Sequence, residues 1–429
     1  PRGRLSPPGG ASAHPGSDSG QCAFRHTITV MTRLTESELR AAVARELPGV
    51  RADLERLARV PSIAFPGFDH TQVERSAEMT AELLRGCGLD VSIVRAGGQP
   101  AVIGTRPAPP GAPTVLLYAH HDVQPVGDAA KWESDPFTPV ERDGRLYGRG
   151  VADDKAGVMV HVAALRALGD ALPVGVVVFV EGEEEYGSES LERLLVEHRD
   201  RLAADVIVIA DSGNWDVGVP ALTTSLRGIV NLFVEVRTLT SAVHSGIFGG
   251  PIPDALTVLC RLLATLHDEA GDVAVAGLAR TAAAPLDYPP QRLRAETGML
   301  DGVPFIGTGS LVERMWTKPA LSVIGVDAPA TAEAPNALVA SARAKLSLRI
   351  APGDDPKAAY EAVAEHLRAH APWGVPVEVT PEQFGAPCAI NATGPAYEAA
   401  RAAFRAAWDG VEPVDIGIGG SIPFIATFQ

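Results

Sequence analysis

Acidic and imidazole side chains gather directly after three apolar stretches of the sequence. These stretches are rich in β-branched residues, and the polar groups that follow them are His120-His121-Asp122, Glu183-Glu184-Glu185 and Asp211. A fourth group, Asp153-Asp154, follows the turn 146–152 and directly precedes a helical pattern. Because ligands of open α/β sheets bind beyond the carboxyl ends of the strands, we expect the four groups to converge in space.

Carboxylates that are brought together repel one another, and a bound cation resolves that repulsion. One histidine with several Asp and Glu side chains and no cysteine suits Zn²⁺, Mn²⁺ or Co²⁺ better than a metal that prefers thiolate. Two ions that share a bridging carboxylate would fit the number of candidate ligands and form a hydrolytic pair. Any single acidic cluster can also be a solvated surface loop, but four clusters at strand ends favour a metal centre.

The segment around His120 orients its side chains by their spacing. In an extended segment, residues i and i+2 point to the same side, so Asp122 lies on the side of His120. His120 can therefore bind a metal while Asp122 holds its other ring nitrogen. His121 points to the opposite side, and we expect it to pack or to form a structural hydrogen bond.

The composition limits the functions that the chain can have. Its 429 residues carry 37 basic and 52 acidic side chains, a net charge of −15, which argues against a surface for nucleic acid or anionic lipid. The longest apolar runs, such as 174–180, are far shorter than the roughly 20 residues that span a bilayer. The cysteines lie far apart with no CxxC pair, which favours a reducing, cytoplasmic setting. They are Cys22, Cys87, Cys260 and Cys388.

Alternating helical and apolar segments predict the fold of the first half of the chain. Short β-branched runs bounded by turn residues predict strands at 89–94, 102–105, 115–118, 174–180 and 206–210. Helical stretches such as 73–85 and 156–168 lie between them. This alternation predicts an α/β domain with a mostly parallel sheet.

After residue 220 the pattern changes to strand, helix, strand, strand, helix and strand, which is the order of a ferredoxin-like α+β sandwich. We therefore expect a smaller domain over 221–385, inserted into a larger metal-binding domain formed by 31–220 and 386–429. Within the smaller domain, the Pro- and Gly-rich stretch 282–309 is expected to be a long loop.

Residues 1–30 are rich in Pro, Gly and Ser and have no hydrophobic period. We expect them to be a disordered leader, or translated sequence upstream of a true start at Met31. The folded part should begin near Thr35, which forms a plausible capping box with Glu38 at the start of a helix.

Six motifs, in this order, resemble the di-zinc amidohydrolases: AHHDVQP, LYGRGVADDKAG, EGEEEYGS, VIADSGNW, VHSGIFGG and GGSIP. That family includes carnosinase-like dipeptidases, glutamate carboxypeptidase, aminoacylases, acetylornithine deacetylase and succinyl-diaminopimelate desuccinylase. The His-x-Asp-Val-Gln-Pro and Asp-Asp-Lys segments point to the dipeptidase branch. The resemblance covers the chain from about Met31 to its end. It implies a zinc-aminopeptidase-like catalytic domain, an inserted dimerisation and lid domain, a homodimer, and two divalent ions, with zinc favoured over manganese or cobalt.

The resemblance also implies the metal ligands. Asp153 would bridge both ions, His120 and Asp211 would complete one site, and Glu185 would bind the other ion. In the resembled family, the peptide bond between Asp153 and Asp154 is cis.

Further roles follow from the same resemblance. Glu184 matches the general base, which takes a proton from the metal-bridging water and returns it to the leaving amine. Asp122 belongs to the same catalytic group through its contact with the histidine ligand. His244 matches a histidine that reaches the active site of the partner subunit and stabilises the tetrahedral oxyanion.

Arg349 and Ser421 match groups that hold the free carboxylate of the substrate, for which a guanidinium is well shaped. Asn336 matches a further substrate contact. From residue type alone, Arg349 could equally be an outward strand residue. The family has one more metal-ligating histidine well downstream of GGSIP, whereas this chain ends at Gln429. We therefore expect the site as written to lack one ligand of the second ion.

Together these features predict a metal-dependent hydrolase that cleaves the amide bond of dipeptides or related N-acyl amino acids. An aminoacylase or deacetylase of the same family would use the same residues. A catalytically silent binding or dimerisation protein is the alternative from another class, and the absent histidine favours it. The presence of Glu184 argues against that alternative, because a general base has no structural reason to remain once catalysis is lost.

Overall fold

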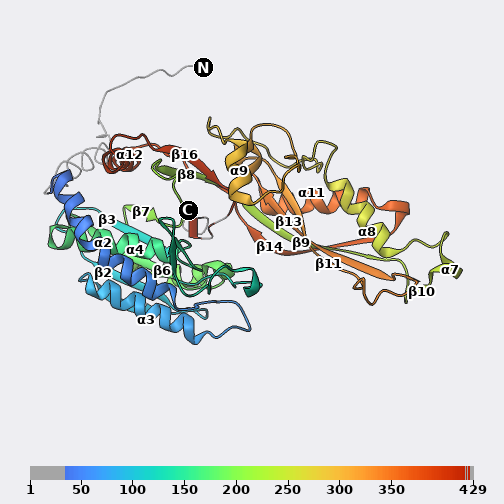
Figure 1. Cartoon of the computed structure of the whole chain (residues 1–429), viewed down its shortest axis with the longest axis horizontal. Helices are drawn as coiled ribbons and strands as arrows, with labels where there is room; N and C mark the ends of the chain where they lie inside the picture. The colour runs from blue at the N-terminus through green and yellow to red at the C-terminus, as the bar shows by residue number, and fades with distance from the viewer. Residues whose placement is uncertain (1–33, 421, 423, 426–429) are drawn as a thin grey trace, which may run out of the picture.

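The protein consists of two lobes. The computed structural model describes residues 34–420, 422, 424 and 425. The leader expected over 1–30 and the candidate residue Ser421 lie outside these described residues. Figure 1 shows the lobes next to each other along the long axis of the molecule, and the last described elements return towards the first lobe.

A five-stranded sheet forms the centre of the first lobe. Its strands stand in the order β1-β2-β6-β3-β7. Their bounds in that order are Asp90–Val94, Ala101–Arg106, Gly175–Glu181, Thr114–His120 and Val206–Ile209. Every residue of β6 is buried, because this central strand is covered on both faces and its run of valines suits such an environment. The strands predicted from the β-branched runs are thus present, with slightly shifted ends.

The pairing of these strands differs from the mostly parallel sheet expected from the sequence. β3 runs parallel to both β6 and β7, whereas the pairs β1–β2 and β2–β6 are antiparallel. Only residues 95–100 connect β1 to β2, and a parallel crossover needs about a dozen residues or more. The sheet is therefore mixed, and the expectation was wrong for β1 and β2.

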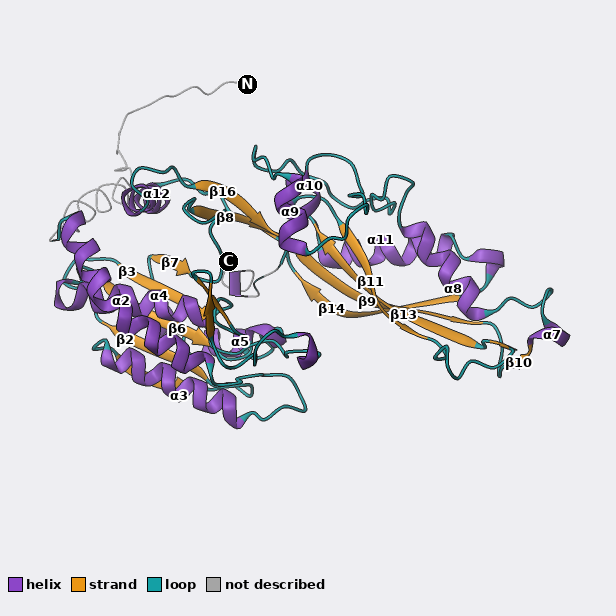
Figure 2. Ribbon diagram, in the orientation of Figure 1, coloured by secondary structure: helices purple, strands orange, loops and turns teal. Residues whose placement is uncertain are grey.

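Helices cover both faces of this sheet (Figure 2). On one face, α2 (Glu36–Ala58), α3 (Thr71–Gly86) and α4 (Lys155–Leu168) enclose an apolar core. On the other face, α5 (Leu191–Glu197) and α6 (Arg199–Leu202) contribute to a second core. None of the helices in the described part of the chain is both long enough and apolar enough to cross a membrane.

The first described helix begins at the predicted capping box. The Glu38 N–H donates to Thr35 Oγ1 at 3.3 Å, and the Thr35 N–H donates to Glu38 Oε2 at 2.7 Å. These bonds satisfy backbone donors that the first turn of α2 would otherwise leave unpaired. A short hairpin of β4 (Val140–Arg142) and β5 (Arg145–Tyr147) precedes α4 along the chain.

A four-stranded antiparallel sheet forms the second lobe. Its order is β11-β13-β9-β14, with bounds Ala320–Asp327, Ser341–Ile350, Gly228–Arg237 and Val377–Gly385. Alternate residues of β9 and β13 face α8 (Ala255–Leu263) and α11 (Pro356–Ala369) and form a separate apolar core with them. The chain order of strands and helices is the one that the sequence pattern predicted.

The far end of the second lobe carries a small appendage. There β10 (Val243–His244) pairs with β12 (Ala337–Leu338), next to the short helix α7 (Ser245–Phe248) (Figure 1). Ile247 and Phe248 of α7 are exposed.

A three-stranded sheet joins the lobes. In it β8 (Ala221–Leu226) pairs with β15 (Cys388–Ala389) and with β16 (Val414–Ile418). The helix α12 (Pro395–Ala407) lies between β15 and β16 along the chain. The junction is thus built from segments that flank the second lobe on both sides in the sequence.

The stretch 282–309 contains a helix, although the sequence predicted a loop. α9 (Pro290–Thr297) begins with a proline in its first turn and is followed by Gly298 at φ 64°, and these are ordinary helix boundary signals. Tyr288, just before α9, packs with Trp316 of α10 (Leu311–Trp316) in an apolar cluster that includes residues of β8 and β16.

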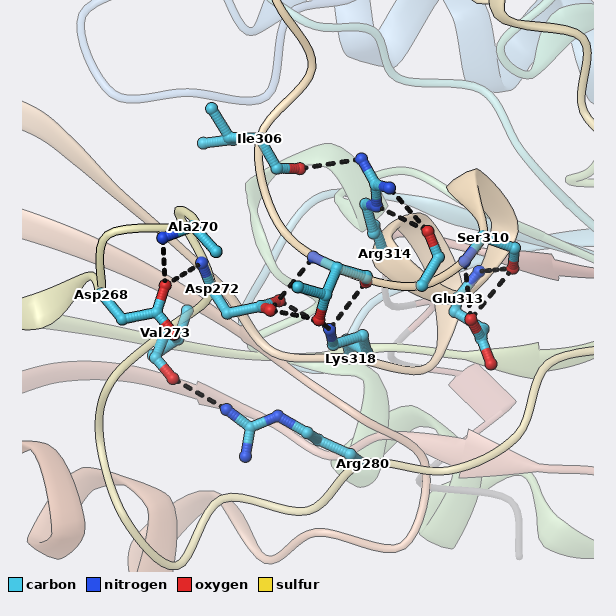
Figure 3. A network of polar contacts seen from close by, with 12 residues as sticks. Asp268, Ala270, Asp272, Val273, Arg280, Ile306, Ser310, Glu313, Arg314 and Lys318 are labelled. Carbon is cyan, nitrogen blue, oxygen red and sulfur yellow. Dashed lines mark hydrogen bonds and ion pairs between the residues drawn. The ribbon is translucent and has the colours of Figure 1, made fainter.

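A polar network holds the loop that follows α9 (Figure 3). Asp272 accepts hydrogen bonds from the Thr308 N–H at 3.0 Å and from the Lys318 ammonium at 2.6 Å. Lys318 also donates to the Thr308 carbonyl at 2.8 Å, and Arg314 donates to the Ile306 carbonyl at 3.0 Å. Burial of the Asp272 carboxyl opposes its ionisation, but the donors from Lys318 and Thr308 outweigh this effect and lower its pKa to about 2.

Asp272→Asn is expected to lower the free energy of unfolding at pH 7 by about 1–3 kcal/mol, because Lys318 loses its charged partner. A carboxyl whose pKa is lowered on folding stabilises the protein only while it is ionised. The difference in the free energy of unfolding between wild type and Asp272→Asn should therefore be largest above pH ~4 and disappear towards pH ~2. Urea unfolding of both proteins at several pH values measures the difference. Asp301→Asn changes an exposed aspartate of the same loop, and an equal loss in this control would contradict the role of the network.

Candidate metal centre

The parallel strands of the first lobe bring polar residues to one edge of the sheet. His120 is the last residue of β3, the segment Glu183–Glu185 follows β6, and Asp211 follows β7. Asp153 and Asp154 directly precede α4. The structure thus brings together the four groups that the sequence singled out.

The imidazole of His120 is at the centre of this cluster. Its Nε2 atom lies 3.1 Å from Asp153 Oδ1, 3.8 Å from Glu184 Oε2 and 4.0 Å from Asp211 Oδ1. Its Nδ1 atom lies 3.3 Å from Asp122 Oδ1. One ring nitrogen therefore faces three carboxylates, while the other is in contact with Asp122.

Asp122 connects the end of β3 to the turn η3 (Glu184–Tyr186) that follows β6. Its two carboxylate oxygens accept hydrogen bonds from the backbone N–H groups of Glu184 and Glu185, each at 3.1 Å. The same carboxylate contacts His120 and is fully buried. One side chain thus sets the relative positions of three members of the cluster.

Two sets of three side chains have the spacing of metal ligands. His120, Asp153 and Glu185 form one set, and His120, Asp154 and Asp211 form the other, with ligand atoms all within 4.8 Å of one another. The peptide bond between Asp153 and Asp154 is cis, as expected. Asp154 was not among the ligands expected from the family resemblance, which assigned only Asp153 of this pair. Asp154 does cap α4, and it also faces the cluster.

Burial and mutual repulsion disfavour the charged forms of four of these carboxyl groups, whereas the hydrogen bond with His120 lowers the pKa of Asp153. Burial raises the pKa of Glu184 to about 9, that of Asp154 to about 8 and that of Glu185 to about 7, and neighbouring carboxylates contribute to each shift. Burial also raises the pKa of Asp211. A divalent cation within the cluster would reverse this effect, because it stabilises all the ionised forms at once.

The two adjacent histidines have opposite surroundings. Burial opposes protonation of His120, but its hydrogen bonds with Asp122 and Asp153 prevail and raise its pKa well above the usual value. His121 is turned towards the Pro100 carbonyl, 2.9 Å from its Nε2, and burial lowers its pKa to about 4. The structural role expected for His121 is therefore confirmed.

The donor set fits divalent ions of intermediate softness. Both ligand sets combine one imidazole nitrogen with carboxylate oxygens, which suits Zn²⁺, Mn²⁺ or Co²⁺. Within the described residues, the ion pairs of Asp153, Glu184 and Asp211 involve only His120, and no Lys or Arg side chain pairs with them. The negative charge of the cluster is thus left for a bound cation to balance.

Arg349 lies on the second lobe, outside the metal cluster. It is near the end of β13, opposite Ile229 of β9, and is half-buried. Burial and the charge of Arg349 lower the pKa of the neighbouring Arg227 to about 10. Among the described residues, neither guanidinium forms an ion pair, and Arg227 donates instead to the Arg314 carbonyl at 3.3 Å. Two such groups without a carboxylate favour the binding of an anion.

His244 and Asn336 lie at the far end of the second lobe. His244 is opposite Ala337 where β10 pairs with β12, and the Ser245 N–H donates to the Asn336 carbonyl at 3.0 Å. Figure 1 shows β10 and α7 at the opposite end of the molecule from β3, β6 and β7. The structure does not bring these two residues to the metal cluster of their own chain.

Fold and site together define a class of protein: a two-lobed α/β protein with a carboxylate-rich centre for divalent metal at the ends of parallel strands. The model of the family described as Peptidase family M20/M25/M40 matches residues 116–429. The chain belongs to this peptidase family.

Relatives with named activities cover most of the chain. The sequence is 37% identical to the cysteinylglycine-S-conjugate dipeptidase of Corynebacterium striatum over 373 residues, which are 85% of this chain and 82% of that protein. It is 31% identical to the Beta-Ala-His dipeptidase of Rattus norvegicus, over 83% of this chain and 78% of that protein. The crystal structure of human carnosine dipeptidase 1 matches with a TM-score of 0.79 at 26% identity, covering 92% of this chain and 89% of that chain.

Binding of Mn²⁺ is expected to tighten as the pH rises from about 6 to about 8, because carboxyl groups with raised pKa values must lose protons before they can act as ligands. Calorimetric titration in buffers of different ionisation enthalpy should detect the released protons. His120→Ala should weaken binding strongly, whereas His198→Ala, outside the cluster, should not. Binding that is independent of pH, or unaffected by His120→Ala, would contradict this assignment.

Proposed function

We propose that the protein is a metal-dependent dipeptidase. The observation that carries this proposal is the cluster of carboxylates around His120 Nε2, in a chain that belongs to a peptidase family. The similarity to proteins named as dipeptidases over more than four-fifths of the chain supports a dipeptide as substrate. The names of these proteins indicate that cysteinylglycine and β-alanyl-histidine are the substrates to test first.

The proposed site holds two divalent ions, with zinc the first candidate and manganese or cobalt the alternatives. Asp153 would bind both ions, His120 and Asp211 would bind one of them, and Glu185 would bind the other. The distances of Asp153 and Asp211 from His120 Nε2 support a shared ion for these three side chains. Bound ions supply Lewis acidity, which polarises the scissile carbonyl and acidifies a water molecule.

Glu184 is the proposed general base. Its carboxylate is 3.8 Å from His120 Nε2, and its backbone N–H is held by Asp122. In this position it can accept a proton from the attacking water and return it to the amine that leaves. Asp122 orients both His120 and the Glu184 backbone. Its proposed part in catalysis is therefore to fix the position of the general base, Glu184, relative to the metal ligand, His120.

Arg349 is proposed to bind the free carboxylate of the dipeptide, together with Ser421, which lies outside the described residues. The half-buried Arg349 guanidinium, which has no carboxylate partner among the described residues, supports this role. An N-acyl amino acid carries the same carboxylate, so an aminoacylase or deacetylase remains the alternative within the family. The names of the similar proteins favour the dipeptidase.

A homodimer is proposed to complete the active site. We divide the chain into a catalytic domain of 31–220 and 386–429 and an inserted dimerisation and lid domain of 221–385. His244 and Asn336 are at the end of the second lobe that is remote from Arg349, and the ten residues of β9 alone span roughly 33 Å. A second copy could present both side chains to the metal cluster across a dimer interface.

A cytoplasmic location is proposed from the spacing of the cysteines, which includes no CxxC pair.

Glu184→Gln should reduce kcat by about 10²–10⁴-fold and leave metal affinity close to that of the wild type, because the variant loses only proton transfer. Glu189→Gln changes an exposed residue of the same segment and serves as the control. Hydrolysis of cysteinylglycine, β-alanyl-histidine and N-acetylated amino acids measures both the loss and the substrate class. Wild-type turnover by Glu184→Gln would exclude it as the base, and activity restricted to the N-acetylated compounds would favour the deacylase.

His244→Ala and Glu184→Gln are each expected to be inactive alone but to complement each other after mixing and subunit exchange. A heterodimer has one site with an intact Glu184 and an intact His244 from the partner, so random exchange should restore about a quarter of wild-type activity. Native mass spectrometry confirms that heterodimers have formed. Heterodimers without recovered activity would show that His244 does not act across the interface.

A further inference from the structure

The short segment that contains Asp122 and Gln124 forms hydrogen bonds to the turn of Glu184 and Glu185 through two different side chains. Asp122 accepts hydrogen bonds from the backbone N–H groups of both residues, each at 3.1 Å. Two residues further on, Gln124 Nε2 donates to the Glu185 carbonyl at 3.1 Å and to Glu185 Oε2 at 2.8 Å. The N–H, the carbonyl and the carboxylate of Glu185 are therefore all bonded to one segment.

The spacing of the segment explains this arrangement. His120, Asp122 and Gln124 are at positions i, i+2 and i+4, so an extended backbone directs all three side chains to one side. His120 faces the metal cluster. Asp122 accepts hydrogen bonds from the N–H groups of the turn, and Gln124 donates to the carboxylate of that turn's Glu185.

The hydrogen bond from Gln124 gives the two oxygens of the Glu185 carboxylate different surroundings. Oε2 accepts the hydrogen bond from Gln124, whereas Oε1 accepts none among the described residues. The second donor contact, to the Glu185 carbonyl, uses the same amide nitrogen and fixes the direction of the side chain. A neutral amide suits this position, because a cationic donor would compete with a metal ion and an apolar side chain would leave the carboxylate free to rotate.

We propose that Gln124 is a positioning residue that holds Glu185 Oε2, so that Oε1 is presented to a metal ion. This inference rests on the proposed function, in which Glu185 is a metal ligand. Gln124 acts through Glu185 and contacts neither ion nor substrate. It thereby sets the affinity of the protein for one of the two ions and does not affect proton transfer by Glu184.

The test compares metal binding by Glu185→Gln and Gln124→Met. Glu185→Gln identifies the Co²⁺ ion that depends on this carboxylate, by the step that it removes from a titration followed by the visible absorption of Co²⁺. Gln124→Met keeps the length of the side chain but lacks the donor. It should weaken that same step by about 10- to 100-fold and change its absorption band, while the other step is unchanged.

Gln99→Met is the matched control, because Gln99 is also half-buried and contacts His70 outside the cluster, at 3.0 Å. If Gln124→Met unfolds, Gln124→Ala is titrated in its place, with circular dichroism to confirm folding. An unchanged Glu185-dependent step in either folded variant overturns the role of Gln124 alone. An unchanged titration of Glu185→Gln overturns the ligand assignment in the proposed function, so the two failures are distinguishable.

Discussion

The repulsion between buried carboxylates around His120 is the constraint on which the rest of the structure depends. Three parallel strand ends and the start of a helix bring these acidic groups to one place, where burial raises the pKa of most of them. Such a cluster is stable in its ionised form only with a cation. Asp122 and Gln124 keep its geometry, because they hold the neighbouring backbone and side chain by hydrogen bonds and so oppose rearrangement.

The second lobe carries its candidate functional residues at two opposite ends, at different distances from this cluster. Arg349 is near the end of β13 that adjoins the junction, whereas His244 and Asn336 are at the remote end. A single chain therefore offers a metal cluster and one candidate anion site, while His244 and Asn336 lie at the end of the second lobe that is remote from the metal cluster. This separation is the physical reason to propose that catalysis requires two copies, since no bending of a ten-residue antiparallel strand would bring its two ends together.

The sequence was informative where local patterns decide the structure, and less so where distant segments do. The β-branched run of β6 and the Thr35 capping box are local signals, and both were predicted. The antiparallel pairing of β2 with β6 depends on segments far apart in the chain, and the preference for parallel strands did not indicate it. Asp154 was not predicted as a ligand, and the structure shows that it both caps α4 and faces the cluster. Gln124 had a usable signal, its i+4 spacing from His120, but glutamine is not a typical ligand.

The separate apolar cores have a consequence for the way in which the protein loses its structure. One core is formed by residues of the second lobe, two others by residues of the first lobe together with Phe424, and a smaller cluster around Trp316 lies at the junction. Because cooperativity follows contiguous packing, we expect the two lobes to unfold as separate cooperative units. We expect the second lobe to open, to exchange its amide hydrogens or to be cut by a protease while the sheet beneath His120 stays folded. Damage to the second lobe would then remove the proposed dimer contact and the proposed carboxylate site at Arg349, while the metal cluster would stay intact.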